Sequence, residues 1–179
     1  MFFELTISDD LRKLKASFEQ RIARSRSEES RKKACLEFLP KLIACCMNRE
    51  ECESVFRSCL RLGLDNESII LVFAALLSFA KTINDFQGAF MWRPDGCLKS
   101  PLLQDHLCRF RSLIELEIGE AVTFRDHDQI WMNYIGMAYD RGHPRILPFL
   151  ESWLRTAKTE EEKKRAMDRF PQYVQALLF

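Results

Sequence analysis

The sequence predicts an all-α protein, an irregular bundle of about seven to eight helices around an apolar central helix over residues 66–83. Hydrophobic residues make up 47% of the chain and glycine and proline number six each, which favours a packed core over disorder or a loop-rich all-β fold. Apolar residues recur at the three- and four-residue spacings of amphipathic helices along much of the chain. Residues 69–80 are apolar except for Ser78, a pattern typical of a helix that others surround.

The first two helices are each predicted from a capping residue and an apolar stripe. Ser8 is the predicted N-cap of the first helix, which ends near Arg24. The second helix starts near Ser27, and Pro40 should kink it because proline lacks a backbone N–H donor and crowds the preceding turn. The stripes consist of Leu11, Leu14, Phe18 and Ile22 in the first helix and of Ala34, Cys35, Phe38, Leu39, Leu42 and Ile43 in the second.

Polar caps also mark the starts of the third and fourth helices. Asn48 and Glu51 resemble a capping box at the start of the third helix. Gly63 is a natural residue for the end of that helix, because glycine adopts the left-handed conformation readily. Asp65 or Asn66 caps the fourth helix, which is the expected centre of the fold.

Residues 84–100 are expected to be irregular, because they contain three residues that disfavour helices. These are Gly88, Pro94 and Gly96. Long connections in compact domains often carry function, and this one is also rich in large apolar side chains. We expect a single helical domain over residues 1–179, with a substructure of residues 1–83 and 101–179 joined by this aromatic-rich segment as the alternative.

Four more helices are predicted after residue 100. Proline favours the first position of a helix, where its missing N–H costs no hydrogen bond. The predicted starts are Ser100 with Pro101, Asp126 with Gln129, Pro144, and Thr159 with Glu162; the predicted ends are Gly119, Gly142 and Pro171. No self-similarity at a fixed period of about 20 to 50 residues is visible, which disfavours a regular solenoid.

The net charge and the number of cysteines limit which partners and which cellular compartment we expect for this protein. Lys and Arg number 27 against 26 Asp and Glu, so the net charge of +1 gives no overall attraction to nucleic acid or anionic membranes. The odd number of cysteines, seven, in a chain with ample core material favours reduced thiols, of which Cys97 is expected to be the most exposed. Residues 1–5 lack the features of a secretory signal, and residues 69–80 are too few to span a bilayer. We therefore expect a cytoplasmic or nuclear protein that has no membrane span and is not secreted through a signal peptide.

No motif for catalysis, metal binding or nucleotide binding stands out. The closest pairs of metal-ligating types are Cys45 with Cys46 and His106 with Cys108, and neither has the spacing of a zinc site. Aspartates flank His127, but consecutive residues do not share a helix face. Glycine-rich phosphate loops are absent from the sequence. We therefore expect no enzymatic activity, no cofactor and no metal site, with a thiol-dependent enzyme as the least favoured alternative.

The first third of the sequence is locally basic. Residues 12–33 include nine basic and three acidic residues. A patch of this kind neutralises phosphates with an affinity that falls as salt rises, so RNA binding is the main alternative function. The candidate nucleic-acid-binding residues are Arg12, Lys13, Arg21, Arg24, Arg26, Arg31, Lys32 and Lys33.

The aromatic residues 86–92 are the other candidate for function. Large apolar side chains in a connection either anchor it to the bundle or form a surface for a partner. The predicted partner-binding residues are Phe90, Met91 and Trp92. The leading hypothesis is a non-enzymatic α-helical protein that binds a protein partner, for example a viral or bacterial protein that acts on a host partner. The sequence leaves open whether the chain forms a homo-oligomer.

Overall fold

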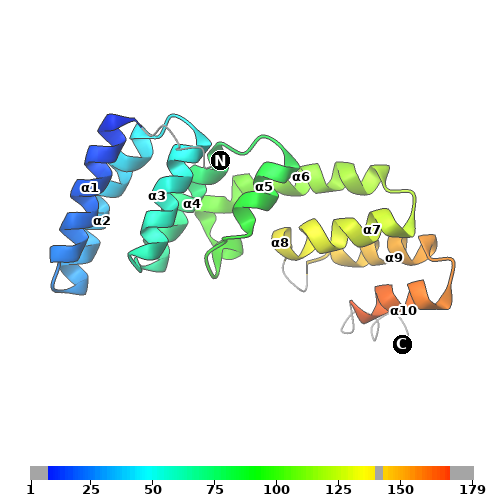
Figure 1. The fold of residues 1–179 in the computed structure, drawn as a ribbon. Coiled ribbons are helices and arrows are strands. Elements are labelled where there is room, and N and C mark those ends of the chain that lie inside the picture. The colour runs from blue at the N-terminus through cyan, green and yellow to red at the C-terminus, as the bar shows by residue number, and fades with distance from the viewer. Residues whose placement is uncertain (1–7, 140–142, 170–179) are drawn as a thin grey trace. The chain divides into compact units, whose positions relative to one another are not determined.

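The computed structural model describes residues 8–139 and 143–169, and every regular element in these ranges is helical (Figure 1). The α-helices are α1 (Asp9–Arg24), α2 (Glu28–Cys45), α3 (Arg49–Arg61), α4 (Asn66–Ser78), α5 (Ile83–Phe90), α6 (Gln104–Glu120), α7 (Phe124–Ile130), α8 (Gly136–Ala138), α9 (Ile146–Thr156) and α10 (Glu160–Asp168). Two 3-10 turns, η1 (Cys97–Lys99) and η2 (Pro101–Leu103), precede α6, and the π-helical turn η3 (Trp131–Ile135) joins α7 to α8.

The all-α prediction is confirmed for the described residues. Because α7, η3 and α8 are continuous, these residues form nine helices, which exceeds the predicted seven or eight. None of the helices in the described ranges combines the length and apolarity that a membrane span requires.

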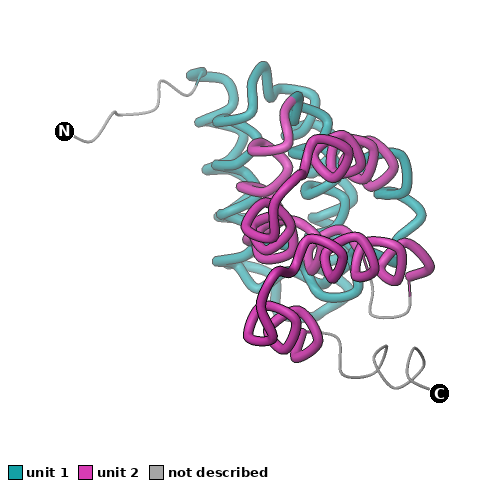
Figure 2. The backbone as a smooth tube through the Cα atoms, turned by 90° about the vertical axis from the view of Figure 1, so that its right-hand side faces the viewer, with its two compact units in different colours: residues 1–81, 92–106 teal, residues 82–91, 107–179 magenta. Residues whose placement is uncertain are grey.

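The chain divides into two compact units (Figure 2). Unit 1 consists of residues 1–81 and 92–106, and unit 2 of residues 82–91 and 107–179. The single domain over residues 1–179 stays a prediction.

Unit 1 is built from two helical hairpins, α1 with α2 and α3 with α4. α2 also packs against both helices of the second hairpin, and η2 packs against α4. An aromatic pair lies inside each hairpin: the ring centres of Phe18 and Phe38 are 5.7 Å apart, and those of Phe56 and Phe73 are 5.5 Å apart. The aliphatic core of the unit includes Leu11, Ile22, Leu39, Leu42, Val55, Val72 and Leu77.

Four connections between consecutive helices share one construction of three residues. They are residues 25–27, 46–48, 121–123 and 157–159. The first residue of each turn donates its N–H to the carbonyl oxygen three residues earlier. The last residue is an N-cap, whose side-chain oxygen accepts the N–H three residues further on. Because three residues span only a short distance, three of these turns place the next helix against the previous one: α2 packs on α1, α3 on α2 and α10 on α9.

The apolar helix is shorter than the predicted 66–83. α4 ends at Ser78, because Thr82 starts a new helix with a capping box in which Thr82 and Asp85 each accept the other's backbone N–H. α4 packs against α2, α3 and η2, while Leu71 remains 36% exposed. Its role as the centre of the whole fold stays a prediction.

Several other predicted boundaries need correction. Residues 84–90 belong to α5 and are not irregular, although Gly88 lies within this helix. The sixth predicted helix starts at Phe124 and not at Asp126, because Thr123 is its N-cap and Asp126 is the capping-box partner. α9 begins at Ile146, two residues after Pro144. Gly142 and Pro171 lie outside the described residues.

Five other predicted starts agree with the structure, whereas Ser100 and Pro101 begin the 3-10 turn η2 and α6 itself begins at Gln104. Ser8, Ser27, Asn48 and Asp65 are N-caps that accept a backbone N–H. The capping box of Thr159 and Glu162, at the start of α10, is also present. Gly63 adopts the predicted left-handed conformation, with φ of 58°. α2 continues through Pro40 to Cys45, so the proline does not end it.

Aromatic side chains make up a large part of the core of unit 2. Phe86 and Phe90 of α5 both stack on Phe110 of α6, with ring centres 5.1 and 5.2 Å apart. α7 packs against α9, and α9 packs against α10. Trp153 of α9 is fully buried, with its ring centre 5.5 Å from that of Phe124. The core of unit 2 therefore combines these rings with aliphatic side chains, which include Leu107, Ile114, Ile130, Ile146 and Leu150.

A buried carboxylate, that of Glu51, joins the starts of α1 and α3. Asn48 Oδ1 accepts the N–H of Glu51, as the predicted capping box requires. The Glu51 carboxylate, however, accepts the N–H of Met47 at 2.7 Å and the N–H of Ser8 at 3.0 Å. These two bonds hold the N-cap of α1 against the turn before α3, and they lower the pKa of Glu51.

We expect Glu51→Gln to lower the free energy of unfolding by about 1–3 kcal/mol, because one of the two part-buried N–H groups loses its charged acceptor. The pKa of Glu51 is lower when folded, so the stabilisation is present above its ordinary value of 4.5 and is lost as pH falls through the folded value. Urea unfolding at several pH values measures both effects. The matched control is Glu50→Gln, which removes an exposed charge next in sequence. Equal unfolding midpoints for the two variants at neutral pH would contradict this role.

Candidate functional site

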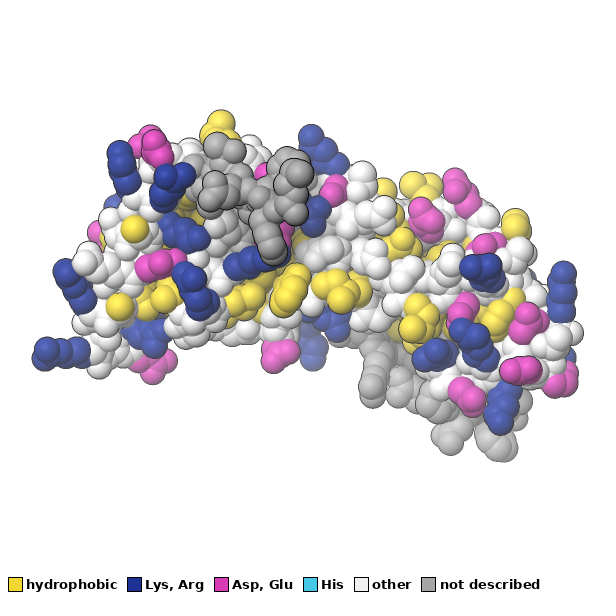
Figure 3. All heavy atoms as spheres, in the orientation of Figure 1, with side chains coloured by type: hydrophobic (Ala, Val, Ile, Leu, Met, Phe, Trp, Pro, Cys, Tyr) yellow, Lys and Arg dark blue, Asp and Glu magenta, His cyan; other side chains and the backbone are white. Residues whose placement is uncertain are grey.

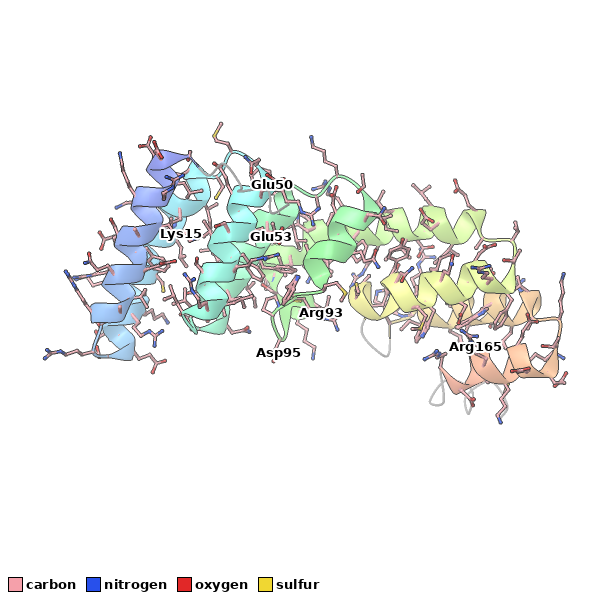
Figure 4. All side chains as sticks on the ribbon, viewed as in Figure 1. Lys15, Glu50, Glu53, Arg93, Asp95 and Arg165 are labelled. Carbon is pink, nitrogen blue, oxygen red and sulfur yellow. The ribbon has the colours of Figure 1, made fainter. Side chains whose placement is uncertain are left out.

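A polar groove lies between α1 and α3 in unit 1. α3 carries polar side chains at spacings of three and four, which places them on one face of the helix. Lys15 projects from α1 toward this face, as Figure 4 shows with Glu50 and Glu53. The hollow has a volume of about 540 Å³ and is lined by Lys15, Glu50, Glu53, Ser54, Arg57, Ser58 and Arg61.

Hydrogen bonds and ion pairs order the side chains of this groove. Lys15 Nζ donates to Ser54 Oγ at 2.8 Å, so the lysine spans the groove to a neutral partner. Arg57 pairs with Glu53 on the same helix at 2.5 Å. Arg61 crosses to Glu19 of α1 at 2.7 Å. The groove therefore presents both signs of charge in fixed positions.

Trp92 lies beside this groove. Its side chain is 61% exposed, and the guanidinium carbon of Arg57 is 6.0 Å from the centre of its ring. The segment that carries Trp92 is fastened to α4, because Asn66 Nδ2 donates to the carbonyl oxygen of Asp95 at 2.9 Å. Pro94 is buried, and Gly96 takes the left-handed conformation, with φ of 70°, that starts η1. An ordered segment thus holds a tryptophan at the surface.

The three predicted partner-binding residues have different surroundings. Phe90 is 2% exposed and stacks on Phe110, so its ring belongs to the core of unit 2. Met91 and Trp92 are 66% and 61% exposed. The structure therefore leaves Met91 and Trp92 as surface candidates and gives Phe90 a packing role.

The predicted nucleic-acid-binding residues are mostly exposed, and two of them have partners within the chain. Arg12 pairs with Asp9, and Arg31 donates to the carbonyl oxygens of Leu62 and Gly63. On the face drawn in Figure 3, acidic side chains are interspersed among the basic ones of unit 1. The remaining members, Lys13, Arg21, Arg24, Arg26, Lys32 and Lys33, are exposed.

A second hollow, of about 690 Å³, brings three of these basic residues together. They are Arg26, Arg31 and Lys32, which lie where the α1–α2 and α3–α4 turns meet. Glu28, Asp65 and Glu67 line the same hollow. Its charges balance, so it gives no concentrated attraction to phosphate.

The cysteines are distributed differently from the expectation. Cys97 is 1% exposed and buried, whereas Cys108 on α6 is exposed; the prediction that Cys97 is the most exposed thiol is wrong. Cys97 is buried because its 3-10 turn packs into unit 1 in place of a loose loop. Burial raises the pKa of Cys59 to about 12. No disulfide joins any of the seven cysteines, all of which lie in the described ranges.

His127 is the most buried of the imidazoles, 1% exposed. Its Nδ1 lies 3.0 Å from the carbonyl oxygen of Thr123 and its Nε2 lies 3.0 Å from Ser152 Oγ, so the ring connects α7 to α9. The flanking acids have other roles: Asp126 completes a capping box, and Asp128 pairs with Arg165 of α10. Among the described residues, no group of three or more histidine, cysteine, aspartate or glutamate side chains is arranged to hold a metal ion.

No protein-family model, curated protein or solved structure matches this chain. The protein is therefore classified by its fold and by its groove. It is an all-α protein in which unit 1 has an ordered, charged groove with a tryptophan beside it.

The sequence indicated Trp92 but not the groove next to it. The residues missed are Lys15 and the polar face of α3, including Arg57 and Arg61. Their spacing in the sequence is that of any solvated helix face. The signal that distinguishes them is their position opposite α1 and beside Trp92, which depends on the tertiary fold.

Thiol exposure gives a direct test of the thiol-dependent enzyme alternative. We expect iodoacetamide to label Cys108 first under native conditions, and Cys59 to be labelled only on unfolding, because the thiolate is the reactive form. Peptide mass spectrometry at successive times measures the order of labelling, and Cys108→Ser, which should remove the fast phase, is the control. A buried thiol that reacts faster than Cys108 would instead favour the enzyme.

Proposed function

We propose that this chain is a non-enzymatic α-helical interaction protein that binds a segment of a protein partner along the groove between α1 and α3, with Trp92 as the anchor. The observation that carries the proposal is the 61% exposed Trp92 ring, held next to Arg57 of the groove. Tryptophan and arginine are the residue types that most often dominate the free energy of binding at protein interfaces. A fixed ring also loses little conformational entropy when a partner covers it.

The charges of the groove support a particular chemistry for the partner. Arg57 and Arg61 already pair with carboxylates, whereas Lys15 donates to the neutral hydroxyl of Ser54. A carboxylate from the partner would form a charge-assisted hydrogen bond with Lys15. An aromatic or aliphatic side chain would cover the exposed face of Trp92. The expected ligand is therefore a segment with an acidic residue close to a large apolar one.

We expect Trp92→Ala to weaken binding of such a segment at least ~10-fold, equivalent to about 1.4 kcal/mol. The probe is a library of random peptides displayed on phage and selected on the immobilised full-length chain. Fluorescence anisotropy then measures the affinity of the enriched peptides for each variant. Lys15→Met should weaken the acidic peptides and leave purely apolar ones unchanged, because it removes the charge and keeps most of the apolar stem.

The matched control is Met132→Ala in unit 2, which truncates a 56% exposed apolar side chain that does not line the groove. Trp92→Ala and Met132→Ala should both have the melting temperature of the wild type, because truncation of an exposed side chain changes stability little. Sedimentation velocity tests whether a second copy of this chain fills the groove. In that case the wild type would sediment as a dimer, and Trp92→Ala would sediment as a monomer. Failure to enrich any peptide that distinguishes wild type from Trp92→Ala would overturn the proposal.

RNA binding through the basic N-terminal third remains the alternative hypothesis, and seven of its eight candidate residues are exposed. Under the proposal above we expect no retention of a uridine oligonucleotide in filter-binding titrations at about 50 mM salt. Retention that is lost at about 200 mM salt, and that falls in a Lys32→Glu, Lys33→Glu double variant, would favour RNA over a protein partner.

A further inference from the structure

Three features of the groove follow one another along α3. Glu50, Ser54 and Arg57 lie on one face of the helix, and their spacings of four and three residues are about 6 and 4.5 Å along its axis. Lys15 Nζ lies 2.8 Å from the Ser54 hydroxyl, and the Trp92 ring lies 6.0 Å from the Arg57 guanidinium carbon. Figure 4 shows Glu50, then Lys15, then the segment that follows α5, in this order along α3. A negative charge, a positive charge and an aromatic ring therefore form a row.

Each member of this row is accessible to a partner. Glu50 is exposed, and no hydrogen bond or ion pair joins its carboxylate to another of the described residues. Lys15 donates to a neutral hydroxyl, and Trp92 is 61% exposed. The arginines that line the groove, in contrast, already pair with carboxylates of α1 and α3. A complementary ligand therefore has a basic, an acidic and an apolar residue, in this order from the start of α3.

The length of the row fits a helical ligand better than an extended one. The level of Glu50 and the level of Arg57 are about 10.5 Å apart along the axis of α3, and side chains at i and i+7 on one face of a ligand helix have the same separation. Three side chains on one face of an extended chain recur at every second residue and span about 13 Å. α1 and α3 both pack against α2, so the groove has a helix for each wall, a surface of the kind that receives amphipathic helices.

The order of the charges sets the direction of such a helix. A carboxylate four residues before a lysine stabilises a helix more than the reverse order does, because of the helix dipole. A ligand helix with this order has its basic residue toward its C-terminal end, and that end lies beside Glu50 at the start of α3. The ligand therefore runs antiparallel to α3, with its dipole opposed to that of α3.

We propose that the groove binds an amphipathic helix that runs antiparallel to α3 and carries an apolar residue, an acidic residue three or four positions later and a basic residue four positions after that. The apolar residue covers Trp92, the acidic residue accepts a hydrogen bond from Lys15, and the basic residue pairs with Glu50. This inference rests on the proposed function, to which it adds the conformation of the ligand, its direction and the contact with Glu50.

The test starts from the phage-selected peptides whose binding to the full-length chain depends on Trp92. We expect these peptides to share the spacing above and to gain helical circular dichroism on binding. Glu50→Lys should weaken them about 3-fold, and it should strengthen to a similar degree the peptides in which glutamate replaces the basic residue. The matched control is Glu37→Lys, which makes the same change of charge at an exposed residue of α2 that does not line the groove, and which should leave both affinities unchanged.

A photocross-linker at either end of the peptide tests the direction. Benzophenone at the C-terminal end should label the turn before α3, residues 46–48, and benzophenone at the N-terminal end should label the end of α3, residues 58–61. Mass spectrometry of the digested complex locates each label.

The outcomes separate this inference from the proposed function. Trp92-dependent peptides that bind in an extended conformation, lack the spacing, exchange the two labels or ignore Glu50→Lys would overturn the inference and leave the proposed function standing. The absence of any Trp92-dependent peptide would overturn both.

Discussion

The three-residue capped turn is the constraint on which the arrangement of unit 1 depends. A helix start leaves four backbone N–H groups without partners, and a side-chain cap that satisfies one of them contributes about 1 kcal/mol. At residues 25–27 and 46–48 the cap sits only three residues after the previous helix, so it also fixes where that helix must stop. Two such turns in succession return α3 to the side of α1. The Glu51 carboxylate then joins their starts by accepting the N–H of Ser8, and the polar face of α3 comes to lie opposite Lys15.

Helix starts were largely readable from the sequence because capping is local chemistry. Ser8, Ser27, Asn48 and the Thr159 box needed no knowledge of the rest of the chain. The errors arose where two local signals competed. The apolar run after residue 66 concealed the Thr82 capping box, and Gly88 suggested a loop where Phe86 and Phe90, one helical turn apart, pack on Phe110. Tertiary packing of two rings outweighs the cost of one glycine in a helix, which is about 1 kcal/mol.

The candidate site was less predictable, because a surface residue is defined by its neighbours in space. Phe90 and Trp92 belong to the same aromatic cluster in the sequence, yet Phe90 is in the core and Trp92 is at the surface. Their difference follows from the end of α5. Phe90 lies on the same face of the helix as Phe86, whereas Trp92 comes after the helix has ended. Nothing in the sequence marked Arg57 and Lys15 as binding residues, since basic side chains are common on any solvent-exposed face of a helix. Only the return of α3 beside α1 makes the two cations line one groove.

The groove and the buried stripe occupy opposite faces of α3, and this separates binding from packing. Cys52 belongs to the buried stripe with Val55, Phe56 and Cys59, while Ser54 and Arg57 face the groove. The Glu51 carboxylate joins the starts of α1 and α3 by accepting backbone N–H groups, so it holds the two helices together without using any side chain of the groove. Truncation of a groove side chain should therefore change binding and leave the packing of α3 in place, because exposed truncations change stability little.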